Sequence, residues 1–126
     1  MSNPKKILND PYEVGADMLE ALIEAYDCEV VKAGTASLVR THVPEGKVAL
    51  LVVGGSGHEP IYHGLVGTNL ADGAARGDIF AAPPPNVILE CAQAVNRGNG
   101  VLFVYGNYAG DVLNFDLAAD LWSGRQ

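Results

Sequence analysis

The strongest constraint on the fold comes from an apolar run that ends in a glycine loop. Residues 48–53 contain no polar side chain, and Gly54-Gly55-Ser56-Gly57 follow directly. An uninterrupted run of this kind is typical of a strand buried on both faces, as at the centre of a parallel sheet. Pro60 stands where a helix can begin. A strand, a glycine loop and a helix start place chemistry at the carboxyl edge of an α/β sheet, with His58 at the mouth of the loop.

Length and composition narrow the class of protein. The 126 residues predict one domain, residues 1–126, and 48% hydrophobic residues are enough for a packed core. The net charge of -7 argues against nucleic acid and against an anionic membrane surface as partners. No metal-ligand spacing occurs, so no metal site is expected, and Cys28 and Cys91 are interpreted as buried small hydrophobes. With no apolar signal core or spanning run, we expect a cytoplasmic protein.

Helices and strands alternate along the chain. Helical spacing and start signals predict helices at residues 11–26, at 60–66, from 85 to before 98, and over about 112–122. Apolar runs predict strands at 28–31, 37–41, 48–53, 78–82 and 101–105. The small, glycine-rich residues 70–77 are interpreted as a surface loop over the sheet edge. The pattern predicts an α/β fold with a largely parallel sheet and helices on both faces.

Three of the predicted strands end in unusual loops, at residues 54–58, 82–85 and 106–111. Each loop precedes a helix, and right-handed crossovers would bring all three to one edge of the sheet. We therefore expect a single ligand site at the carboxyl edge of the strands.

General motifs do not explain the glycine loop. A dinucleotide fingerprint needs a third glycine where Pro60 stands, and a phosphate-binding loop needs a lysine that is missing here. A hydrolase elbow needs a glycine at the position of His58. From the residues alone, a tight turn and a ligand-contacting backbone both remain open.

His58 and Asp111 are the candidate catalytic residues. His58 adjoins glycines at a predicted helix start, which favours a functional role, although most lone histidines lie on the surface or in a satisfied core. Asp111 precedes a predicted helix, where an aspartate is most often an N-cap. Its functional alternative is a general base on the same sheet edge as His58.

At these residues the chain resembles the dihydroxyacetone kinase family, in the N-terminal half of its substrate-binding K subunit. The resemblance rests on Gly54-Gly-Ser-Gly-His-Glu-Pro60, on Gly77-Asp-Ile-Phe80 and on Asn107-Tyr-Ala-Gly-Asp-Val-Leu-Asn-Phe115. These motifs occur in order within a similarity that runs from about Lys5 to Leu121.

The resemblance implies a cytoplasmic phosphotransferase that makes dihydroxyacetone phosphate. It implies that the backbone at Gly55 and Ser56 and the imidazole of His58 hold a small ketose, a triose or a related tetrose, with Gly57 in the same binding loop. It also implies that Asp111 lies beside the hydroxyl to be phosphorylated. The chain itself would bind no cofactor. The phosphoryl donor, ATP or a phosphotransferase-system relay, would arrive on a nucleotide-binding partner subunit or domain. A homo- or hetero-oligomer that includes a complementary K-subunit half is expected.

The sequence also departs from the family pattern. Members typically carry a glycine at the position of Val53, a histidine at Tyr62, and a substrate-site lysine at Gly106. The histidine that binds the ketone as a hemiaminal has no counterpart among His42, His58 and His63. The missing lysine and the missing hemiaminal histidine favour an alternative, a non-catalytic metabolite-binding or regulatory module derived from the family, whereas the presence of His58 and Asp111 favours the kinase. A hydrolase that uses Ser56 with His58 is a third, weaker alternative.

Overall fold

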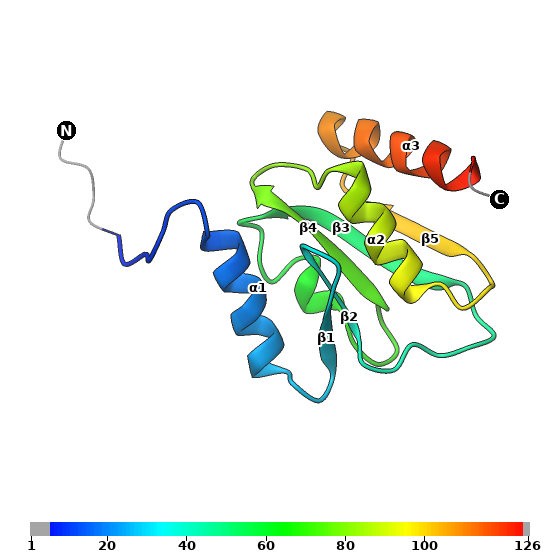
Figure 1. Cartoon of the computed structure of the whole chain (residues 1–126), viewed down its shortest axis with the longest axis horizontal. Coiled ribbons are helices and arrows are strands. Elements are labelled where there is room, and N and C mark those ends of the chain that lie inside the picture. Colours follow the sequence, from blue (N-terminus) through cyan, green and yellow to red (C-terminus); the bar gives the residue numbers. More distant parts are fainter. Residues whose placement is uncertain (1–5, 125–126) are drawn as a thin grey trace.

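A computed structural model describes residues 6–124 (Figure 1). The ends of the predicted domain, residues 1–5 and 125–126, lie outside the described residues. In chain order the elements are α1 (Val14–Ala25), β1 (Val30–Ala33), β2 (Ser37–Arg40), β3 (Ala49–Ser56), η1 (His63–Leu65), β4 (Gly73–Ile79), α2 (Pro85–Val95), β5 (Val101–Tyr105) and α3 (Ala109–Ser123). None of the helices within residues 6–124 combines the length and the hydropathy that crossing a membrane requires.

The five strands form one mixed sheet in the order β1-β2-β4-β3-β5. β3 pairs in parallel with both β4 and β5, whereas β1 with β2 and β2 with β4 are antiparallel. The α/β class is confirmed, but the sheet is mixed rather than largely parallel. The cause is local: residues 34–36 join β1 to β2 in a tight turn around Gly34, which has φ +56°, and so short a connection can only make a hairpin.

β4 is the strand that the sequence pattern does not predict. A surface loop is expected at residues 70–77, yet β4 runs through Gly73–Ile79, buried between β2 and β3. Its first three residues, Gly73, Ala74 and Ala75, are small because helices approach the strand from both sides. Ala74 and Ala75 are fully buried in cores on opposite faces of the sheet. A β-carbon on Gly73 would stand 2.8 Å from Cγ1 of Val95 in α2.

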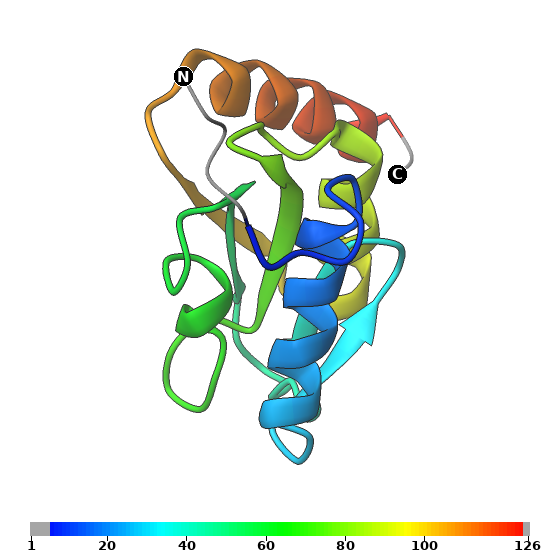
Figure 2. The same cartoon turned by 90° about the vertical axis from the view of Figure 1, so that its left-hand side faces the viewer.

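Helices cover both faces of the sheet, as predicted. α2 and α3 lie beside each other on one face (Figure 1), where they pack on Leu51, Val53 and Ala75. α1 and η1 lie on the other face (Figure 2), where Leu19 of α1 packs on Leu38 of β2. The two layers bury the middle of the sheet and leave the ends of its strands free to build a site.

Two of the predicted helices are shorter in the structure. α1 begins at Val14 rather than at residue 11, because the preceding residues form a turn in which Glu13 N–H donates to the carbonyl of Asp10 at 3.1 Å. The helix expected at residues 60–66 is reduced to the single turn η1. Tyr62 has φ +69°, which no right-handed helix accommodates.

A buried charge cluster ties the amino ends of β3 and β4 together. The carboxylate of Asp72 is fully buried and accepts hydrogen bonds from Lys47 Nζ at 2.6 Å, from Leu50 N–H at 2.8 Å and from Arg40 at 3.1 Å. Burial alone would raise the pKa of Asp72, but these donors outweigh it and hold the pKa below its ordinary value. Asp72 is therefore an anion that joins β2, β3 and β4 at the end of the sheet opposite the cavity described next.

Candidate functional site

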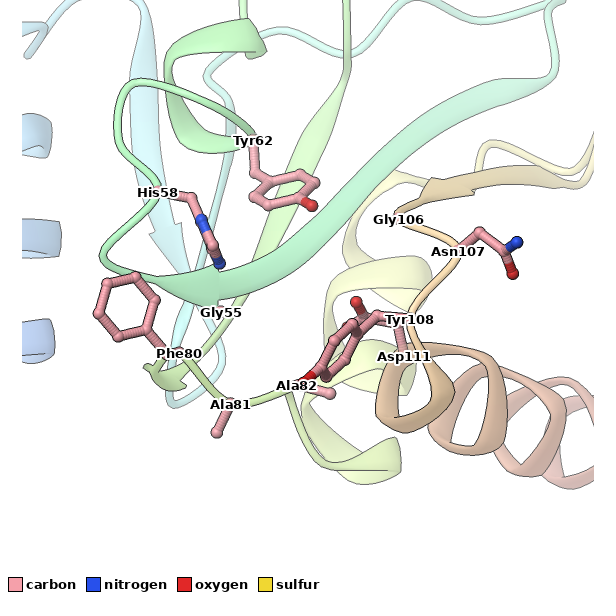
Figure 3. Close-up of a pocket in the computed structure, with 10 residues that line it drawn as sticks. All are labelled: Gly55, His58, Tyr62, Phe80, Ala81, Ala82, Gly106, Asn107, Tyr108 and Asp111. Carbon is pink, nitrogen blue, oxygen red and sulfur yellow. The ribbon is translucent and has the colours of Figure 1, made fainter.

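A cavity of about 470 Å³ opens where β3, β4 and β5 end (Figure 3). Its walls come mainly from the three segments that follow these parallel strands, so the three predicted loops meet at one sheet edge. The lining residues are Gly55, His58, Tyr62, Phe80, Ala81, Ala82, Gly106, Asn107, Tyr108 and Asp111.

Three of the five predicted site residues, Gly55, His58 and Asp111, line this cavity. Gly55 is required by space: a β-carbon there would lie 2.7 Å from the carbonyl oxygen of Ala81. The glycine therefore lets the segment after β4 close against β3, and this contact forms the floor beneath His58.

Ser56 and Gly57 do not line the cavity. Ser56 is fully buried, and its hydroxyl donates to the carbonyl of Gly77 at 2.8 Å. The hydrogen bond commits this hydroxyl to β4, so a hydrolase that uses Ser56 as a nucleophile with His58 is not supported. Gly57 has φ +97°, a conformation that favours glycine, and its N–H donates to Glu59 Oε2 at 2.7 Å. Both residues shape the turn that presents His58.

Aromatic rings hold the imidazole of His58 in place. The ring of Phe80 meets it edge-on at a centroid distance of 5.1 Å, and that of Tyr62 meets it edge-on at 6.4 Å. Phe80 has φ +53°, so both aromatic residues adopt backbone conformations that are uncommon for side chains of this size. His58 is thus a polar group on a preformed aromatic wall, which suits a small polar ligand.

Asp111 presents a buried carboxylate to the cavity from the first turn of α3. It does not cap the helix, as the structural alternative supposes: Tyr108 occupies the N-cap position, and no side chain makes a capping hydrogen bond. Asp111 Oδ1 is buried without a hydrogen-bond partner. Burial raises the pKa of Asp111, and the nearby imidazole of His58 acts in the opposite direction. A carboxylate with an unused acceptor and a raised pKa is equipped to take a proton from a ligand hydroxyl.

Sequence reasoning missed several lining residues, above all Tyr62 and Phe80. Both residues have a positive φ, which directs the ring to a place that helical or extended backbone would not reach. A positive φ is uncommon for tyrosine and phenylalanine, so the sequence does not predict it. Tyr108 and Asn107 lie in the predicted loop at residues 106–111, but the sequence gives them no defined role.

Within residues 6–124, no group of three His, Cys, Asp or Glu side chains is placed to hold an ion. Cys91 lies on the buried side of α2, and burial raises the pKa of its thiol to about 12, so it stays protonated. Cys28 is exposed, contrary to its interpretation as a buried hydrophobe.

Comparison with known proteins assigns the family. The Dak1 domain matches residues 20–125, so this chain belongs to the Dak1 family. The chain is 42% identical over 118 residues to the dihydroxyacetone-binding subunit DhaK of the PEP-dependent dihydroxyacetone kinase of Escherichia coli (strain K12). That alignment covers 93% of this chain and 33% of the relative. The chain therefore spans about a third of the length of this relative and corresponds to its N-terminal portion.

Solved structures agree with the fold. The dihydroxyacetone kinase from C. freundii, in complex with AMP-PNP and Mg²⁺, is similar with a TM-score of 0.86 and 32% identity, over 93% of this chain and 23% of that one. The dihydroxyacetone kinase operon co-activator Dha-DhaQ is similar with a TM-score of 0.80 and 29% identity, over 86% of this chain and 34% of that one. The same fold therefore occurs in proteins described as a kinase and as a co-activator.

Proposed function

We propose that this chain forms the ketose-binding part of a dihydroxyacetone-kinase-like subunit. The observation that carries the proposal is the meeting of His58 and Asp111 at one cavity in a member of the Dak1 family. A cavity of about 470 Å³ is ample for dihydroxyacetone or a related triose or tetrose, and its polar groups are few and convergent.

Each residue has a defined task in this proposal. His58 hydrogen-bonds the ketose and orients it against its aromatic wall. Asp111 accepts the proton of the ketose hydroxyl as that oxygen bonds to phosphorus and the phosphorus–oxygen bond of the donor breaks. The loops after β3, β4 and β5 hold the ketose hydroxyl in line with the phosphorus atom and its leaving oxygen. Such positioning supplies much of the rate enhancement in phosphoryl transfer.

The phosphoryl donor and the remaining parts of the site belong to partners in this proposal. The donor is ATP or a phosphotransferase-system relay, bound on a separate kinase subunit or domain in the cytoplasm. Relatives are named for both kinds of chemistry: the E. coli subunit belongs to a PEP-dependent kinase, and the C. freundii kinase was solved with AMP-PNP. A complementary K-subunit half supplies the hemiaminal histidine, for which this chain has no counterpart.

An exposed apolar face, formed by Val48, Leu102 and Val104, is the place we propose for that half. Their exposed fractions are 52%, 57% and 49%, and β5 is an edge strand with one side unpaired. Exposed apolar strands at an edge are docking surfaces unless they are blunted by charge or proline. Because the E. coli DhaK subunit is about three times as long as this chain, a complementary half is the occupant that fits.

A second candidate is a non-catalytic metabolite-binding or regulatory module. Glycine replaces the family lysine at position 106, and the co-activator similarity shows that this fold is not confined to kinases. The two candidates share ketose binding and differ in turnover. Binding without phosphoryl transfer, once a complementary half and a donor system are supplied, would favour the module.

Calorimetric titration of the chain with dihydroxyacetone tests the shared part of the proposal. His58→Asn should weaken binding by roughly 3- to 10-fold, the loss of about one hydrogen bond. The matched control is His42→Asn, since His42 is exposed after β2 and does not line the cavity. Equal affinity of both variants and the wild type, or no binding at all, would contradict the assignment.

A further inference from the structure

Tyr62 occupies a space that two glycines keep open inside the cavity. A β-carbon on Gly54 would overlap the Tyr62 ring. A β-carbon on Gly106 would stand 3.3 Å from the Tyr62 hydroxyl oxygen and 3.7 Å from Asp111 Oδ2. The phenol therefore crosses from the end of β3 toward the end of β5, and its hydroxyl points to Gly106 (Figure 3). The hydroxyl and the carboxylate of Asp111 border the same small volume.

The backbone at Tyr62 is strained, and its conformation directs the side chain into the cavity. Tyr62 is the central residue of a γ-turn with φ +69° and ψ -79°, closed by His63 N–H donating to the Ile61 carbonyl at 3.1 Å. This kind of γ-turn is rare and strained for a residue with a side chain. Strain of this sort persists where the surroundings over-determine it, and it gathers at ligand sites.

The phenol and the carboxylate have complementary chemistry. Burial and the negative charge of Asp111 both raise the pKa of Tyr62, so its hydroxyl keeps its proton and is a donor. Asp111 has a buried acceptor oxygen, Oδ1, with no partner. A ligand oxygen between them can receive one hydrogen bond from Tyr62 and give another to Asp111.

We infer that Tyr62 is a ligand-binding residue, whose hydroxyl donates a hydrogen bond to the same ketose oxygen that Asp111 contacts. The inference rests on the proposed function, because it assumes that a hydroxyketone occupies this cavity. It assigns Gly54 and Gly106 a purpose as well: each leaves room for the phenol, and a side chain at either position would displace it.

Tyr62→Phe tests the inference, since it removes the hydroxyl and keeps the ring over Gly54. Dihydroxyacetone binding, followed by calorimetry, should weaken by about 3- to 10-fold, the loss of one neutral hydrogen bond. Tyr12→Phe is the matched control, because Tyr12 is 95% exposed. A shared ligand oxygen also predicts that the losses from Tyr62→Phe and Asp111→Asn are not additive.

Two further measurements separate binding from structure. Adding dihydroxyacetone to the wild type should perturb the near-ultraviolet tyrosine absorption. Tyr62→Phe should reduce that change to the part contributed by Tyr108, which also lines the cavity, without altering the melting temperature. Gly106→Ala places a methyl group against the hydroxyl, so it should weaken binding in the wild type and have little effect in the Tyr62→Phe background. Where Tyr62→Phe folds poorly, Gly106→Ala alone should still weaken dihydroxyacetone binding, and unchanged binding by that variant would contradict the inference.

The outcomes distinguish this inference from the proposed function. A wild type that does not bind dihydroxyacetone overturns both. A wild type that binds, with Tyr62→Phe binding equally well or more tightly, overturns the inference alone, because the phenol would then be a plug in the cavity rather than a donor.

Discussion

At the scale of single residues, the charged form of Asp111 that the proposed chemistry needs is the form that burial destabilises. Its carboxylate is buried with Oδ1 unpaired, and burial raises its pKa. A raised carboxyl pKa means that the folded state favours the protonated form. The associated stability is present at low pH and is lost as the pH rises through the folded pKa. The charged form of this side chain therefore costs stability, as expected of a residue kept for function.

Asp111→Asn should accordingly separate activity from stability. Asn mimics the protonated form, so the free energy of unfolding at pH 7 should not fall. Phosphoryl transfer, measured with the completed subunit and its donor, should drop by roughly 10²–10⁴-fold because the proton acceptor is gone. In the wild type, the acidic limb of the pH–rate profile should lie above the ordinary carboxyl value of 3.8. Full turnover in Asp111→Asn would remove Asp111 from catalysis.

His58 and Asp111 could be predicted from the sequence because both lie in motifs that directly follow predicted strands. Sequence reasoning does not identify Tyr62 or Phe80, since their places in the cavity follow from positive φ angles rather than from residue type. It expects the backbone at Gly55 and Ser56 to hold the ligand, and in the structure the Ser56 hydroxyl itself donates to the carbonyl of Gly77. Which side of a glycine loop each group faces is settled only by the strand packed beside it.

At the scale of elements, β4 shows why the strand pattern fails where packing is tightest. Hydrophobic periodicity is weak in Gly73–Ile79 because the volume beside the strand is already filled by α2 on one face and by α1 and η1 on the other. β3 and β5, with larger apolar side chains, are predicted within a few residues. Small residues in a central strand thus resemble a loop in sequence while they lie in the core.

Gly77→Ala should damage both β4 and the cavity. A β-carbon there would overlap the carbonyl of Ala81 and stand 2.7 Å from Pro83 N, and backbone atoms yield little. We expect a loss of about 1–3 kcal/mol in unfolding free energy, measured by urea denaturation, together with weaker ketose binding because Ala81 lines the cavity. Gly67→Ala is the control, since its β-carbon would meet nothing within 4 Å. Equal stability of the two variants would contradict this account of β4.

At the scale of the whole molecule, the two edges of the sheet differ. β1 forms one edge and β5 the other, and the proposed docking face of Val48, Leu102 and Val104 lies on the β5 side. Edge strands with exposed apolar residues associate unless they are covered. Association with another chain is therefore expected at the β5 edge. The sequence indicates such association only through its high content of apolar residues.

Val104→Lys should weaken association with a complementary subunit half, or with a second copy, while unfolding free energy changes by less than about 1 kcal/mol. Val31→Lys is the control, because Val31 is 40% exposed on the opposite edge strand. Sedimentation velocity and co-purification with the complementary half are the measurements. Wild-type behaviour as a monomer at high concentration, with no capture of that half, would rule out this face as an interface.

The charge cluster around Asp72 and the cavity lie at opposite ends of the same parallel strands. The residues that fasten the sheet are therefore not the residues that meet a ligand. Such a division lets the side chains at the carboxyl edge change while the ion pairs at the amino edge keep the strands in register. Within this architecture, substitutions around the cavity can alter ligand specificity with little effect on the stability of the sheet.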